Sequence, residues 1–177
     1  MNEIFRLIRS VLIAGFSEQG MTVRVKQNYS DTSSGPPDVP AIIMHHIGTE
    51  RVGWQSRKGE VVNAADRVVE RQNVAETIQF NAVLPSVKPE DETVDTPTVQ
   101  GVLTLASMIL QSKPMLDALK SAGMGVQVVK AIQSNYIQNE KEQWENVPSF
   151  DLVICHKLTL AHSTGVVDGF TSGIYRV

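Results

Sequence analysis

The sequence has few of the residues from which disulfide frameworks and metal sites are built. It contains one cysteine, Cys155, and four histidines among 177 residues. A single cysteine excludes an internal disulfide framework and favours a reducing compartment. The net charge is −3, so a general surface for nucleic acid is not indicated. No apolar run approaches the roughly 20 residues that span a bilayer, and Glu3 and Arg6 argue against a signal peptide.

Metal-ligand spacings are also missing. His45 and His46 are adjacent in a predicted strand, so their side chains point to opposite faces and cannot share one metal ion. His156 and His162 share a face but lie ~20 Å apart at ~3.3 Å per residue. No His-x-His, Cys-x-x-Cys or His-Glu-x-x-His pattern occurs. We therefore predict no metal site.

Catalytic and cofactor motifs are lacking as well. There is no Gly-x-Ser-x-Gly elbow, P-loop or dinucleotide fingerprint. Cys155 lies in the middle of an apolar strand pattern, which is typical of a core thiol and not of a nucleophile. The sequence predicts no catalytic residue and no cofactor.

The clearest pattern that is present runs from Val74 to Leu110. Its first part alternates as a half-buried strand does, and one face carries Val74, Glu76, Ile78, Phe80, Ala82 and Leu84. Because Glu76 interrupts this apolar face, we expect the buried part to begin at Ile78. Thr96 is the predicted N-cap of a helix with Pro97 at its first position. The apolar stripe of that helix is Val99, Val102, Leu103, Ala106, Ile109 and Leu110.

The remaining segments add helices and strands around this unit. The patterns predict a helix over about Asn2–Ser17 closed by Gly20, a short helix from Ser112 to Gly123, and strands at residues 21–26, 41–47, 66–84, 126–132, 150–161 and 166–177. The fold class is α+β, with a mixed, mostly antiparallel sheet flanked by two or three helices and an extended β-hairpin arm. Residues 1–177 form one domain in this interpretation.

Two connections carry unusual side chains. Residues 28–40 have the composition of a long exposed loop. Residues 48–59 read as a long hairpin with its tip near residues 56–59, and they hold Trp54 with Arg51, Arg57 and Lys58 nearby. Trp54 either is exposed for a partner or folds back onto the sheet. These four residues are interface candidates.

A further connection, from Lys88 to Asp95, is acidic. Its residues Glu90, Asp91 and Glu92 either belong to a solvated loop or form a negative lumen or partner surface. They complete the set of interface candidates.

Several segments together resemble the tail terminator proteins of tailed bacteriophages, the family of the lambda tail terminator and the neck terminators. The segments are an N-terminal amphipathic helix, the strand end Val23–Asn28, the long strand Glu70–Leu84 followed by helical Thr98–Leu119, the stretch Trp144–Leu152, and the closing Gly165–Asp168. The resemblance covers nearly the whole chain, and the shared features are patterns of architecture and not catalytic motifs.

The resemblance implies a structural virion protein of the tail and neck. Such a protein forms a ring, normally a hexamer, which caps the tail tube, ends tube polymerisation and joins the tail to the head. Its partners would be further copies of itself, the tail-tube protein, a neck or connector protein, and a sheath protein in a contractile tail. DNA would pass through the lumen without specific binding, and assembly would take place in the host cytoplasm, without a membrane.

Two other classes stay open from the residues alone. One is a head–tail connector or another neck adaptor, and the other is a small intracellular α+β enzyme. Ring formation would separate the first class from the enzyme, and binding to tube protein or to portal-side protein would separate a terminator from a connector.

Overall fold

The computed structural model describes residues 2–27, 37–62, 65–85, 97–138 and 144–163. Its elements are α1 (Asn2–Glu18), β1 (Arg24–Gln27), β2 (Ala41–Val62), β3 (Ala65–Val83), α2 (Val99–Leu110), α3 (Lys113–Ser121), β4 (Met124–Val129), β5 (Gln133–Gln138) and β6 (Trp144–Ser163). Three helices and one sheet confirm the α+β prediction.

The sheet is built around the two long strands β3 and β6. The strand order is β1-β2-β3-β6-β4, and β5 pairs with β6 beyond the end of β4. Only the β1–β2 pair is parallel, so the sheet is mixed and mostly antiparallel. In the centre Met44, Phe80 and Phe150 lie opposite one another on β2, β3 and β6. The Phe80 and Phe150 rings stack with centroids 4.9 Å apart.

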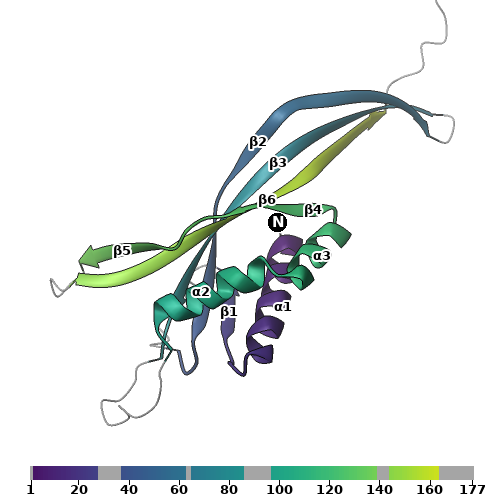
Figure 1. The fold of residues 1–177 in the computed structure, drawn as a ribbon. Helices are drawn as coiled ribbons and strands as arrows, with labels where there is room; N and C mark the ends of the chain where they lie inside the picture. Colours follow the sequence, from purple (N-terminus) through teal and green to yellow (C-terminus); the bar gives the residue numbers. More distant parts are fainter. Residues whose placement is uncertain (1, 28–36, 63–64, 86–96, 139–143, 164–177) are drawn as a thin grey trace, which may run out of the picture.

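The three helices cover one face of this sheet (Figure 1). Alternation along each strand sends every second side chain towards the helices. The fully buried aromatic and aliphatic side chains of this layer are Phe16, Phe80, Phe150, Ile8, Leu12, Ile42, Met44, Ile78, Leu103, Leu110, Met115 and Leu119. The core therefore lies between the helices and the central part of the sheet.

Helix α1 confirms the predicted N-terminal helix. The helix passes close to α2 at Gly15, where an added Cβ would lie 2.7 Å from an Ile109 methyl group. Gly20, with φ of 72°, follows the end of the helix, as glycine commonly does because a left-handed residue there has no Cβ to clash.

Helix α2 has the predicted apolar stripe but not the predicted start. The N-cap is Thr98, whose hydroxyl accepts a hydrogen bond from the Gly101 amide at 3.0 Å, so the predicted cap at Thr96 with helical Pro97 is wrong. The predicted N-cap is two residues too early because a threonine lies on each side of Pro97. Only the packing of the apolar stripe in the folded protein decides which threonine caps the helix. Ser112 is the N-cap of α3 as predicted, although its side chain makes no capping bond.

Strands β2 and β3 correct the predicted hairpin. β2 runs without a break through Val62, and residues 56–59 pair with residues 68–71 of β3, so the tip does not lie there. The polar composition that suggested a turn instead reflects a strand whose side chains are exposed. β5 was not predicted, because its sequence Gln133–Gln138 lacks an apolar alternation. Residues 28–36, the acidic loop and the predicted strand at residues 166–177 lie outside the described residues.

The strands β2, β3 and β6 continue together beyond the helices as a three-stranded extension (Figure 1). We call residues 50–62, 65–73 and 157–163 the arm and the rest of the described chain the body. β6 accompanies β3 as far as the pair Arg67 and Ser163, so the arm is a small sheet and not a two-stranded hairpin. Among the described residues no helix is long and apolar enough to cross a membrane.

Candidate functional site

The arm joins the body at a buried carboxylate. Glu76 lies on the helix-covered face of β3, and the residue is only 5% exposed. Thr49 of β2 and Ile154 of β6 are its partners across the sheet. The expectation that the buried face begins at Ile78 is wrong, because both Glu76 and Val74 are buried.

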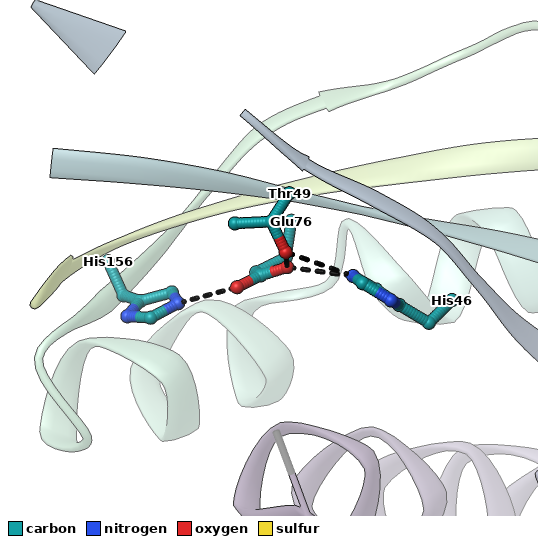
Figure 2. Close-up of polar contacts among 4 residues, drawn as sticks. All are labelled: His46, Thr49, Glu76 and His156. Atoms are coloured by element: carbon teal, nitrogen blue, oxygen red, sulfur yellow. Dashed lines mark hydrogen bonds and ion pairs between the residues drawn. The ribbon is translucent and has the colours of Figure 1, made fainter. Parts of the chain in front are cut away.

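Three side chains from two neighbouring strands bind this carboxylate (Figure 2). His46 Nε2 lies 2.8 Å from Oε2, and the Thr49 hydroxyl donates to the same oxygen. His156 Nε2 lies 3.3 Å from Oε1, on the opposite side of the carboxylate. A carboxylate only accepts hydrogen bonds, so each ring nitrogen donates to it. The cluster ties β2, β3 and β6 together where the arm begins.

The electrostatics of the cluster favour an ionised Glu76. Burial raises the pKa of the Glu76 carboxyl, but the hydrogen bonds from Thr49, His46 and His156 and the charge of His46 lower it by more, so the pKa lies below its ordinary value. Leaving such a group buried without its donors would cost several kcal/mol, roughly 3–5 for a broken buried pair. The junction is thus a place where polar contacts decide the geometry.

The arrangement does not match a catalytic triad. His46 contacts Thr49 at 3.3 Å and Glu76 through the same nitrogen, Nε2, whereas a triad base uses one nitrogen for the nucleophile and the other for the acid. Within the part of the chain that the structure describes, no group of three His, Cys, Asp or Glu residues is arranged to hold a metal ion. The cluster is therefore best understood as a joint between strands.

His45 and Cys155 lie on the opposite face of the sheet. His45 pairs with Gln79 while His46 pairs with Ile78, which confirms that the two rings point to opposite faces. Burial lowers the pKa of His45. Cys155 is only half-buried and its thiol donates to Gln127 Oε1 at 3.0 Å, so the prediction of a core thiol is wrong. The helices lie on the other face, and this face of β6 is covered less well.

A second polar cluster lies on the arm around Glu70. The Arg57 guanidinium is 2.7 Å from Glu70 Oε1, and the Gln55 amide donates to Oε2 at 2.6 Å. His162 Nε2 of β6 is 3.8 Å from the same carboxylate. Arg57 was predicted to be an interface cation, and the structure gives it a partner within its own chain. Glu70 itself was missed, because nothing in its local sequence marks it.

Trp54 stands on a bulge built to expose it. Val52 pairs with Asn73 and Ser56 pairs with Arg71, so residues 53–55 of β2 stand opposite the single residue Gln72. Gly53 has φ of 72°, and the Gln72 amide donates to the Val52 and Gly53 carbonyls at 3.1 and 3.2 Å. Trp54 is 97% exposed, so the alternative in which it folds back onto the sheet is excluded.

The other interface candidates are divided between the arm and the undescribed part of the chain. Arg51 and Lys58 are both exposed on β2. Arg51 lies opposite Val74, close to the junction, and Lys58 lies opposite Val69 in the middle of the arm. Glu90, Asp91 and Glu92 lie outside the described residues. The structure thus places Trp54, Arg51, Arg57 and Lys58 on one strand. The role of the three acidic residues as interface candidates stays a prediction.

A groove of about 600 Å³ opens between α1 and α2 on the helical layer. Its apolar lining includes Val11, Gly15, Leu105, Met108 and Ile109, and Glu18 contributes a charge. Met108 is 63% exposed. The sequence did not predict this groove because Met108 lies outside the predicted buried stripe. Met108 lines a groove only because α1 and α2 pack against each other.

Comparisons with known proteins place the chain in a family. No curated protein matches it. Among solved structures it is similar to the sheath/tube terminator of PVC, an extracellular contractile injection system, in the extended state, with 10% identity and a TM-score of 0.46. That similarity covers 100% of this chain and 64% of the other, so the chain spans less than two thirds of that protein.

The family model of the E217 gateway protein gp29 matches residues 3–166, which is most of the chain. This family is associated with the phage tail, and the match confirms the sequence-based identification of a structural protein of the phage tail. The chain belongs to the family of the E217 gateway protein gp29.

Proposed function

We propose that this protein is the repeating subunit of a ring, a hexamer, that caps the tail tube, ends tube polymerisation and connects the tail to the neck. The match of the gateway-protein family over residues 3–166 carries the proposal. The ring acts by occupying the growing end of the tube, so it needs binding surfaces and no reaction. A structural, non-enzymatic role agrees with the family.

The shape of the subunit supports a ring. A head-to-tail ring uses two different surfaces of the same chain, one for each neighbour, and it closes when the rotation between copies divides a full turn. The arm extends well beyond the helices and carries exposed apolar side chains, including Trp54, Leu158 and Leu160. Apolar side chains that gather on an exposed surface are typical of protein interfaces.

The partners follow from the place of such a ring in the virion. One side of the ring contacts the tail-tube protein, the other contacts a neck or connector protein, and a sheath protein binds nearby if the tail is contractile. DNA passes through the lumen, which it can do freely because stable binding needs basic contacts to phosphates and the chain has a net charge of −3. Assembly takes place in the host cytoplasm, before the tail joins a filled head.

Electron microscopy of the purified protein, with and without tail-tube protein, tests the proposal. We expect rings that bind one end of the tube and stop its growth in a polymerisation assay. Deletion of the gene should leave tubes of uncontrolled length or tails that never join heads. Tails of normal length on filled heads in the deletion strain would contradict the proposal, and rings that bind portal-side protein and not tube protein would favour a head–tail connector.

A further inference from the structure

We infer that Trp54 of one copy inserts into the groove between α1 and α2 of the next copy, so that the arm and the helical layer form the contact between neighbours in the ring. The inference rests on the proposed ring and names its interface. It commits to a second copy of this chain as the occupant of the groove.

The first observation is that the exposure of Trp54 is built into the strand. The bulge at residues 53–55 projects the side chain, and the Gln72 amide fixes the two carbonyls that precede it. A preorganised anchor loses little freedom on binding, and tryptophan is the residue most enriched among the dominant contacts of interfaces. Trp54 is 97% exposed, so the isolated chain leaves this anchor unused.

The second observation is that the groove suits an indole ring. Its volume of about 600 Å³ leaves room for an indole ring. Val11, Leu105 and Ile109 offer aliphatic contacts. Met108 adds a polarisable sulfur, which is favourable beside an aromatic ring, and it is 63% exposed in the isolated chain.

The third observation concerns the positions of the two surfaces and their charges. The arm extends beyond the helices (Figure 1), and Trp54 is 97% exposed and does not line the groove, so it does not occupy the groove of its own chain. Arg51 lies three residues before Trp54 on β2. Glu18 lines the groove. Within the described residues neither Arg51 nor Glu18 forms an ion pair, so the two charges are available to each other across a head-to-tail contact.

The strand edge itself is a less suitable contact. β2 has an outer edge with no neighbouring strand after Met44 among the described residues, but register shifts at His46–Gly48 and Val52–Ser56 interrupt it. Bulges of this kind protect exposed edges from pairing with another strand. The geometry therefore favours docking through a side chain over addition of a strand from another chain.

Disulfide trapping tests the contact in the full-length chain. In a Cys155→Ser background, which removes the only native cysteine, the pair Trp54→Cys and Met108→Cys should give a ladder of covalent oligomers under mild oxidation. The matched control combines Trp54→Cys with Tyr136→Cys, because Tyr136 is 65% exposed on β5 but does not line the groove. The control pair should give dimers at most.

Charge exchange identifies the occupant. Arg51→Glu and Glu18→Arg should each weaken ring assembly several-fold, and the double exchange in one chain should restore it, because every contact then carries the reversed pair. Trp54→Ala should raise the dissociation constant of each contact about 30-fold or more, as truncation of a dominant interface residue does, while Trp54→Phe should keep part of the affinity.

The outcomes separate this inference from the proposed function. A ring without the 54–108 crosslink, or a crosslink from residue 54 to tube protein alone, would overturn the inference and leave the ring standing. A chain that stays monomeric in sedimentation, with and without tube protein, would contradict the ring and the inference together. A ladder specific to the 54–108 pair, with rescue by charge exchange, is the result that we expect.

Discussion

The strand β6 passes through two environments, and the contrast separates what stabilises this protein from what it presents to others. In the body its residue Leu152 is completely buried beneath the helices. In the arm Leu158 and Leu160, on the same face, are 52% and 56% exposed. Full burial of a leucine contributes ~1.5–3 kcal/mol, and the arm forgoes most of that contribution. The body is therefore where folding is stabilised, and the arm is a surface that the body holds in place.

The polar contacts of the two regions differ in the same way. At the junction, Glu76 is buried and bound by His46, Thr49 and His156. On the arm, the Glu70 side chain is 15% exposed, but its partner Arg57 is 72% exposed and open to water, which weakens the pair. Exposed ion pairs contribute about 0–1 kcal/mol, whereas removing one partner of a buried pair costs much more. Changes at the junction should accordingly alter stability far more than changes on the arm.

The largest expected effect is in the body. Phe80→Ala should lower the free energy of unfolding by ~3–5 kcal/mol, because it empties a fully buried aromatic site stacked on Phe150. Urea denaturation followed by circular dichroism measures the loss. An unchanged midpoint would mean that the helix-covered face is not the core.

The next effect concerns the junction and its dependence on pH. Glu76→Gln should destabilise the protein by roughly 2–3 kcal/mol near neutral pH, since hydrogen bonds to a charged acceptor are worth about that much. The folded-state pKa of Glu76 lies below its ordinary value, so the stabilisation is present above the unfolded-state pKa and is lost as the pH falls through the folded-state pKa. The gap between wild type and variant in denaturation curves should therefore close in acid. A gap that is independent of pH would show that Glu76 is not ionised in the folded protein.

A smaller effect is expected where the two helices cross. Gly15→Ala should cost about 1–3 kcal/mol, because the new methyl group must displace Ile109 from a packed site. Gly125→Ala on β4 is a matched control, since nothing lies within 4 Å of a Cβ added there. Thermal denaturation of both variants gives the comparison. Equal melting temperatures would indicate that the helical layer can yield at the crossing.

The smallest effect on stability is expected in the arm. Leu160→Ala should change the free energy of unfolding by less than about 0.5 kcal/mol, the usual range for exposed positions. Leu152→Ala on the same strand is its buried counterpart, with an expected loss of ~2–5 kcal/mol. If the two leucines gave equal losses in urea denaturation, the division into body and arm would not hold.

Sequence patterns were sufficient wherever the periodicity was strong and local. The stripe from Val102 to Leu110 predicted the buried face of α2, and the alternation around Ile154 predicted a central strand. Patterns failed where the local signal was weak or ambiguous. β5 is mostly polar and has no apolar alternation, and the correct helix cap, Thr98, competed with Thr96 two residues earlier.

The candidate site could be predicted only in part, because only some of its residues stand out in the local sequence. Trp54 could be singled out because a tryptophan among glycine and charged residues is unusual, and the structure leaves it exposed. The groove at Met108 could not, because its two walls come from helices about ninety residues apart in the chain. In the local sequence Glu76 only interrupts an apolar face. Its role could not be predicted because it depends on contacts with residues of two other strands.

The sequence by itself determined the class of fold, most of the helix and strand positions, and the composition of the core, because these follow from hydrophobic periodicity over short segments. The family was indicated by the resemblance of several segments to tail terminators and is shown by the family match over residues 3–166. The tertiary structure alone decided that β2, β3 and β6 outrun the helices together, that Glu76 meets His46 and His156, and that Gln72 holds the bulge at Gly53. Each of these depends on strand register between distant segments, and a shift of one residue would send every side chain of a strand to the other face.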